Sequence, residues 1–97
     1  MGVLKIRWYR RALHENDAFM EFYVRRVGVK AARHYLQDVQ STINTLAQMP
    51  TMGRLEEDLS NENARIYSFV FHKRGKLFYR FTSRTLYIVA IKCTLME

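Results

Sequence analysis

The chain has few of the residues that build common cofactor and catalytic sites. Its single cysteine, Cys93, excludes an internal disulfide and favours a reducing compartment such as the cytosol. The four glycines stand apart from one another, so no glycine-rich phosphate loop is present. The three histidines, His14, His34 and His72, fall on different predicted elements and have no metal-ligand spacing. The sequence therefore predicts no cofactor and no metal site.

Long apolar runs are also missing. None approaches the roughly 20 residues that cross a membrane, and basic residues interrupt the first apolar letters. We therefore expect no signal peptide, no membrane partner and a cytoplasmic location. Ninety-seven residues, 48 % of them hydrophobic, are enough for one buried core, so we expect a single domain over residues 1–97.

Acidic residues are absent from most of the last third of the chain. Residues 63–96 contain no Asp or Glu but carry seven basic side chains: Arg65, Lys73, Arg74, Lys76, Arg80, Arg84 and Lys92. With a formal net charge of +7 for the whole chain, this distribution favours a polyanionic target or an acidic protein partner. As an alternative, these charges are solvated turn and edge residues that protect a sheet.

The same third predicts three consecutive strands. Val, Ile, Phe and Tyr dominate residues 65–72, 76–82 and 86–93, and such residues favour a pleated sheet. The connecting turns are short, which requires an antiparallel meander. In the first turn, Gly75 is expected to supply the positive φ of a tight hairpin.

The earlier residues predict a strand and two helices. Apolar and basic side chains alternate over residues 3–9, which indicates a short strand at the edge of, or beside, the meander. A helix is expected over 12–26, starting between Arg11 and Asp17, with Asn16 or Asp17 as its cap, and ending at Gly28. The clearest helix covers 29–49 and stops at Pro50. Residues 51–62 are expected to be a connector in which Leu55 and Leu59 form a helical turn or a tucked loop.

The predicted fold class is α+β. An N-terminal strand precedes an antiparallel helical hairpin, which is followed by a three-stranded antiparallel β-meander (β-α-α-β-β-β). The hairpin has one apolar face, and the sheet is the only surface that can bury it, so the helices should pack on one sheet face. Aromatic residues predicted on both faces would leave the other face as a surface for a protein partner. Alternatively, the connector and the C-terminus cover that face.

One group of side chains is suited to catalysis without a metal. Basic, histidine and tyrosine side chains gather around the first predicted hairpin: His72, Lys73, Arg74, Lys76, Tyr79 and Arg80. A metal-free ribonuclease needs a base, an acid and cations for the phosphorane charge, and these residue types can fill those roles. Strand alternation, however, points Tyr79 and Arg80 to opposite faces. In the structural interpretation, Tyr79 is a core aromatic and His72 a polar strand-end residue.

Three segments together resemble the RelE/ParE superfamily, the toxins of bacterial type II toxin–antitoxin modules. The end of the second helix, Leu46-Ala47-Gln48-Met49-Pro50-Thr51-Met52-Gly53-Arg54, is similar to the family's "L…P…GR" exit. The run Arg65-Ile66-Tyr67-Ser68-Phe69-Val70-Phe71-His72-Lys73 is similar to the "R…VVHK" strand of the ParE-like branch. The last two strands, starting at Lys76-Leu77-Phe78-Tyr79-Arg80-Phe81 and Leu86-Tyr87-Ile88-Val89-Ala90-Ile91, resemble its "KIIYRI…IYIIAV" pair.

The resemblance implies a growth-arresting toxin held inactive by a cognate antitoxin. ParE-like members act on DNA gyrase, whereas RelE-like members cut mRNA on the ribosome; in the latter case the catalytic residues would be Arg65, His72, Lys76, Tyr79 and Arg80. The end of the chain, from Lys92 to Glu97, lacks the Tyr that the nucleases often have and also the basic tail that is usual in ParE-like members. We therefore favour the ParE-like branch, with a weakened or inactive toxin as an alternative. A homodimer or a heterotetramer with the antitoxin fits this interpretation. The remaining alternative is a non-toxic basic module that binds nucleic acid.

Overall fold

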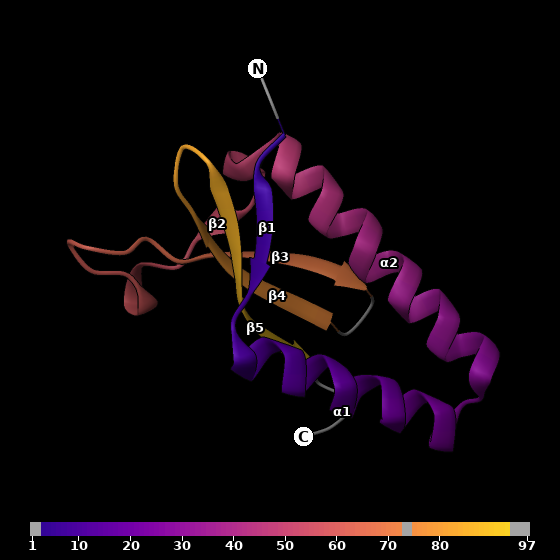
Figure 1. Cartoon of the computed structure of the whole chain (residues 1–97). Coiled ribbons are helices and arrows are strands. Elements are labelled where there is room, and N and C mark those ends of the chain that lie inside the picture. The colour runs from indigo at the N-terminus through magenta and orange to yellow at the C-terminus, as the bar shows by residue number, and fades with distance from the viewer. Residues whose placement is uncertain (1–2, 73–74, 94–97) are drawn as a thin grey trace.

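The computed structural model describes residues 3–72 and 75–93, in which two helices cover one face of a five-stranded sheet (Figure 1). The elements, in chain order, are β1 (Lys5–Trp8), α1 (Arg10–Arg26), α2 (Val29–Gln48), β2 (Arg54–Leu55), β3 (Tyr67–His72), β4 (Gly75–Phe81) and β5 (Thr85–Cys93). Short 3₁₀ turns cover Pro50–Met52 and Glu57–Leu59. In the sheet, the strands are ordered β1-β5-β4-β3-β2. The predicted α+β fold is confirmed.

The N-terminal strand lies at one edge of the sheet, as predicted. β1 pairs in parallel with β5, and Lys5 lies opposite Thr85. All other strand pairs are antiparallel. In the chain, the helical hairpin and strands β2 to β4 lie between β1 and β5, so no tight turn requires these two strands to be antiparallel. The Leu4 N–H donates to the Ala47 carbonyl at 3.0 Å, so this edge is also tied to the end of α2.

The helical hairpin is longer at its start than the sequence predicts. α1 begins at Arg10, so the expectation that Asn16 or Asp17 caps the helix is wrong. The amide oxygen of Asn16 instead accepts a hydrogen bond from the Tyr35 hydroxyl at 2.7 Å. Gly28, at φ 130°, makes the turn between the helices, and α2 ends one residue before the predicted Met49.

The core lies between the hairpin and the sheet. Aromatic rings from both helices stack within it, with the Phe19 and Tyr35 centroids 4.2 Å apart and those of Phe19 and Tyr23 5.3 Å apart. Fully buried aliphatic side chains complete it: Leu46, Leu77, Leu86 and Ile88. This cluster fixes the hairpin against one sheet face and leaves the second face for other contacts.

Tyr79 joins the sheet to the exit of the helical hairpin. Its ring is fully buried, its hydroxyl donates to the Pro50 carbonyl at 2.7 Å, and it accepts from the Gly53 N–H at 3.0 Å. Burial raises the pKa of this hydroxyl. A side chain at Gly53 would collide with the Tyr79 hydroxyl and the Ser68 carbonyl, so this position requires glycine for space.

The connector contains a strand that the sequence does not predict. Arg54 and Leu55 form β2 and pair with Ser68 and Tyr67 of β3. Two residues are too few to show an alternating pattern, which explains why this edge was missed. Leu59 ends a single 3₁₀ turn, as one of the two predicted conformations required, but for Leu55, which lies in β2, both predicted conformations are wrong.

The meander is confirmed, but the role expected of Gly75 is wrong. Among the described residues only Gly28 has a positive φ. Gly75 begins β4 opposite His72, and a side chain there would meet the Phe71 ring at 2.7 Å. Close packing therefore explains this glycine. Lys73 and Arg74 lie outside the described residues. Between Phe78 and Tyr79 a bulge shifts the register with β5.

Glu15 links α1 to β5 through hydrogen bonds and an ion pair. Its carboxylate accepts from the Ile91 N–H at 2.9 Å and from the Lys92 Nζ at 2.7 Å, and Arg11 Nε lies 3.3 Å away. Burial is the largest single influence and raises its pKa, but the hydrogen bonds from Lys92, Ile91 and Arg11 together lower it. The folded protein thus favours the ionised carboxylate.

No helix among residues 3–72 and 75–93 has the length and apolar character needed to cross a membrane.

We expect Glu15→Ala to lower the free energy of unfolding by about 1–3 kcal/mol, because the Ile91 N–H loses its acceptor. Glu15→Gln, which keeps an oxygen but not the charge, should cost less at pH 7. Since the folded pKa is lowered, the charge stabilises the fold above the unfolded value of about 4.3, and this contribution is lost as the pH falls through the folded pKa. Urea unfolding at pH 7 and pH 3 measures both effects. If the difference in unfolding free energy between the wild type and Glu15→Gln is the same at both pH values, the ionised Glu15 carboxylate does not stabilise the fold.

Tyr79→Phe should destabilise the protein by about 1–3 kcal/mol, because the Gly53 N–H and the Pro50 carbonyl both lose their partner. Tyr87→Phe is the control, since the Tyr87 hydroxyl makes no hydrogen bond within the described residues and its removal should change stability by less than about 0.5 kcal/mol. Thermal and urea unfolding of the two variants should separate them. Equal stabilities would disprove the structural role of the Tyr79 hydroxyl.

Candidate functional site

The sheet face away from the helices carries the polar side chains of the central strand. We call it the outer face. Along β4, Leu77 and Tyr79 point into the core, so strand alternation turns Lys76, Phe78 and Arg80 to the outer face. The register places outer-face neighbours on both sides of them: Ser68 and Val70 on β3, and Tyr87, Ala90 and Lys92 on β5.

Lys76 is held in an ion pair on this face. Its Nζ lies 3.1 Å from Glu56 Oε2, and the same oxygen accepts from the Ser68 hydroxyl at 2.5 Å. The ammonium group also lies 5.3 Å from the centroid of the Phe78 ring. Hydrogen bonds from Ser68 and then from Lys76 lower the pKa of Glu56. Lys76 is thus positioned by a carboxylate partner that the sequence interpretation did not include.

Arg80 is held between two tyrosines. Its Nε donates to the Tyr9 hydroxyl at 2.8 Å, and its guanidinium carbon lies 4.2 Å from the centroid of the Tyr87 ring. The two rings meet edge to face at 6.2 Å. A cation over a tyrosine ring is attracted by the negative ring face, so these contacts fix the direction of the guanidinium. Tyr9 follows β1 and is far from Arg80 in sequence, which explains why the pair could not be predicted.

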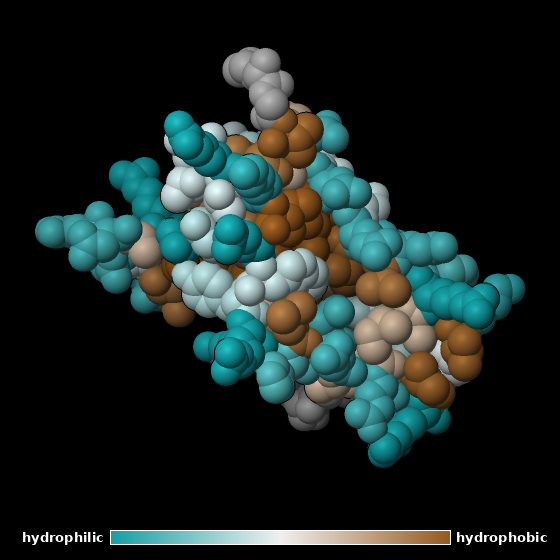
Figure 2. Space-filling view, viewed as in Figure 1, coloured by the Kyte–Doolittle hydropathy of each residue, from teal (hydrophilic) through white to brown (hydrophobic). Residues whose placement is uncertain are grey.

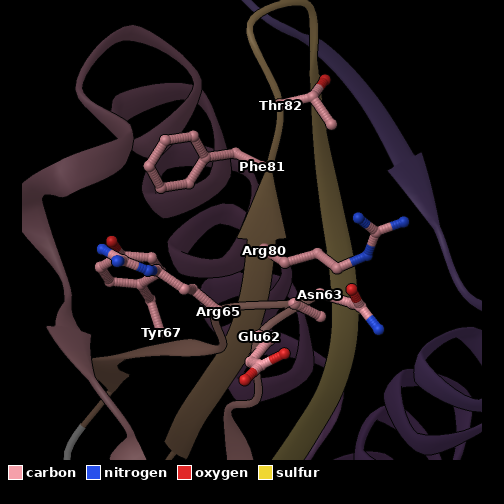
Figure 3. A pocket seen from close by; sticks show the side chains of 8 residues that line it. Glu62, Asn63, Arg65, Tyr67, Arg80, Phe81 and Thr82 are labelled. Atoms are coloured by element: carbon pink, nitrogen blue, oxygen red, sulfur yellow. The ribbon is translucent and has the colours of Figure 1, made fainter.

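Arg65 and Arg80 line a common hollow of about 380 Å³ between the loop before β3 and the end of β4. Its walls come from Glu62, Asn63, Ala64, Arg65, Tyr67, Arg80, Phe81 and Thr82. In Figure 3 Arg65 lies on the side of Tyr67, while Arg80 extends across β5 toward β1. We call this the arginine hollow. The guanidinium of Arg80 contacts Tyr9 and Tyr87, so the two guanidinium groups do not face each other across the hollow. In addition, arginine does not transfer protons in proteins.

The other predicted catalytic residues lie elsewhere. Tyr79 is in the core on the opposite side of β4, as the structural interpretation expected. Lys76 is four residues from Arg80 along the strand, about 13 Å away. His72 pairs with Gly75 through the backbone, and its side chain lies outside the described residues. Of the four predicted residues whose side chains are described, only Arg65 and Arg80 line a common hollow.

A second hollow on the outer face is apolar. It measures about 370 Å³, and we call it the outer-face hollow. Its lining residues come from the connector, the sheet and the start of α1: Arg11, Leu59, Ile66, Phe78, Val89, Ala90 and Lys92. The connector thus contributes to covering the outer face but leaves a hollow with an apolar floor and two basic residues in its wall. Leu59 is 56 % exposed, so part of the lining faces solvent.

The described residues also contain no group of three or more His, Cys, Asp or Glu side chains placed to hold a metal ion. Glu56 and Glu15, the acids that make specific contacts with the sheet, each bind a lysine. These ion pairs position Lys76 and Lys92, which lie opposite each other on β4 and β5. The only sequence signal for the first pair is the cluster of acids at 56–62 just before the segment without acids.

Comparison with known proteins identifies the family. The sequence pattern of the family described as "ParE toxin of type II toxin-antitoxin system, parDE" matches residues 6–97. No curated protein matches the chain. Among solved structures, the chain is similar to one described as the chromosomal ParDE TA system from P. aeruginosa, with 18 % identity and a TM-score of 0.75 over 94 % of this chain and 96 % of that one. At this identity, the likeness establishes a common fold.

The family match confirms the predicted resemblance to the RelE/ParE superfamily and extends from the second residue of β1 through β5. The predicted strand–hairpin–meander order and the structural similarity agree with it. The chain therefore belongs to the ParE toxin family of type II toxin–antitoxin systems.

Proposed function

We propose that this toxin arrests growth in the cytoplasm by binding a protein target, with DNA gyrase as the candidate, and that it has no nuclease activity of its own. The dispersal of the predicted catalytic residues supports this proposal. The Tyr79 hydroxyl is fully occupied within the core, and Lys76 is neutralised by Glu56. A ribonuclease needs its acid, base and cations within reach of one phosphate.

The second candidate is a ribosome-dependent mRNA endoribonuclease. The arginine hollow favours it, because Arg65 and Arg80 both line a space of about 380 Å³. For both to bind one phosphate group, Arg80 would have to leave its contacts with Tyr9 and Tyr87. Two arginines can supply anion binding and stabilise developing charge, but not proton transfer. This candidate therefore requires a further acid–base group, for which the side chain of His72 was the sequence prediction.

We also propose that the cognate antitoxin, which the family implies, docks in the outer-face hollow. The apolar floor formed by Phe78, Val89 and Ala90 fits the apolar side chains of an amphipathic segment. Arg11 and Lys92 in its wall share one carboxylate partner, Glu15, so one positive charge is left in excess. This excess favours an acidic segment, as does the net charge of +7. In this arrangement the antitoxin would cover the exposed apolar side chains of the sheet.

Purified wild-type protein should inhibit supercoiling of relaxed plasmid by DNA gyrase, in a dose-dependent manner. Messenger RNA from cells induced to express the protein should show no new codon-phased ends by primer extension. Arg80→Ala serves as the nuclease probe, and Arg84→Ala, which removes the same charge from an exposed turn, is its control. These two assays separate a protein-binding toxin from a nuclease.

The nuclease would replace the gyrase proposal if supercoiling is unaffected and new mRNA ends appear. These ends should then disappear with Arg80→Ala but not with Arg84→Ala. Harmless expression combined with retention on DNA or RNA that weakens steeply with salt would point instead to a basic binding module.

Leu59→Asp should weaken binding of the antitoxin encoded by the neighbouring reading frame by about tenfold or more, because it puts a carboxylate beside an acidic, apolar segment. Val70→Asp is the matched control: it lies on the outer face, is 64 % exposed compared with 56 % for Leu59, and does not line the hollow. Isothermal titration calorimetry measures both affinities. Equal losses in the two variants would mean that the antitoxin docks elsewhere.

A further inference from the structure

The far end of the helical hairpin exposes a small apolar cluster. Val24, Val27 and Val29 are 46 %, 61 % and 57 % exposed and lie around the turn at Gly28. We call residues 24–33 the hairpin tip. Figure 2 shows hydrophobic surface at this end of the molecule, where the helices meet in Figure 1. Single exposed valines are ordinary, but three around one turn form a protruding apolar contact point.

Positive charge surrounds these valines. The hairpin tip contains Arg25, Arg26, Lys30 and Arg33 and no acidic residue. Arg25 forms an ion pair with Glu21 at 2.6 Å, one turn earlier on α1, with both side chains largely exposed. The tip therefore combines a protruding apolar centre with a basic rim, and it is complementary in shape and charge to an apolar pocket with an acidic rim.

The tip is also held rigidly. The Phe19, Tyr23 and Tyr35 rings stack behind it, with the centroids of Tyr23 and Tyr35 5.5 Å apart. The connection between the helices is only two residues long, Val27 and Gly28, so it allows little separation of the helix ends. A rigid contact point loses little entropy on binding, which is the property that favours affinity at a small protein interface.

We infer that the hairpin tip is the part of the toxin that inserts into its protein target, in an apolar pocket with an acidic rim. This inference depends on the proposed function, because it names the surface with which the toxin engages that target. Charge complementarity selects the occupant: the basic rim requires carboxylates, and the valines require an apolar floor. A nucleic acid would satisfy the basic residues but leave the valines without a partner. An anionic membrane surface offers both properties, but interfacial helices present a broad apolar face, whereas this patch is confined to one turn.

The test compares tip variants with matched variants at the other end of the molecule. Val27→Asp is paired with Val3→Asp, since both valines are 61 % exposed. The double variant Arg26→Glu/Lys30→Glu is paired with Lys5→Glu/Arg7→Glu, which makes the same charge change on exposed residues of β1. Circular dichroism and thermal unfolding confirm that each variant is folded. Growth arrest on induced expression and binding to purified DNA gyrase by biolayer interferometry are the readouts.

Both tip variants should relieve growth arrest and weaken gyrase binding by about tenfold or more, while both control variants retain wild-type behaviour. Folded tip variants that remain as toxic as the wild type would overturn the inference. A second outcome would also overturn it: the wild type sediments with phosphatidylglycerol vesicles, and Val27→Asp abolishes this sedimentation without changing gyrase binding.

The proposed target and the tip can fail separately. A wild-type protein that arrests growth without binding gyrase would overturn the gyrase proposal, and relief of arrest by the tip variants alone would still support the tip. A wild-type protein that neither arrests growth nor binds gyrase would overturn the proposed function and this inference with it.

Discussion

The hydroxyl of Tyr79 ties the middle of the sheet to the point where the helical hairpin ends. It bonds to the Pro50 carbonyl and the Gly53 N–H, and the space it occupies explains why residue 53 has no side chain. Because Tyr79 is committed to the core, strand alternation turns Lys76 and Arg80 outward. One buried hydrogen-bonding group thus determines where the connector starts and which face of β4 carries charge.

Much of the fold could be predicted because long elements show their period in the sequence. The meander, the edge strand and the second helix all have repeated apolar positions, and each is found within one or two residues of its predicted bounds. The start of α1 was missed because Asn16 and Asp17 are residue types that cap helices, whereas the actual partner of Asn16, Tyr35, is remote in sequence. The strand at Arg54–Leu55 is simply too short for any period.

The candidate site was less predictable, for a related reason. Alternation alone separates Tyr79 from Arg80, and that part of the prediction agrees with the structure. The partners that hold the cations, Glu56 for Lys76 and Tyr9 for Arg80, come from other elements, and their pairing depends on tertiary contacts that no local pattern encodes. The same holds for the two hollows, whose walls combine the connector with strands that lie far from it in the sequence.

The length of α1 sets a geometric condition on neutralisation. Arg11 contributes to the outer-face hollow near the start of this helix, and Val27 lies just past its end. Sixteen residues of helical rise separate them by about 24 Å. A peptide anchored in the hollow needs roughly seven more extended residues to reach the far end of the helix. An inhibitor with a shorter reach leaves that end of the helix accessible. Toxin, inhibitor and target could then form a ternary complex. In that complex, the inhibitor would act by steric bulk or by changing the orientation of the bound toxin, and not by competing for the same surface.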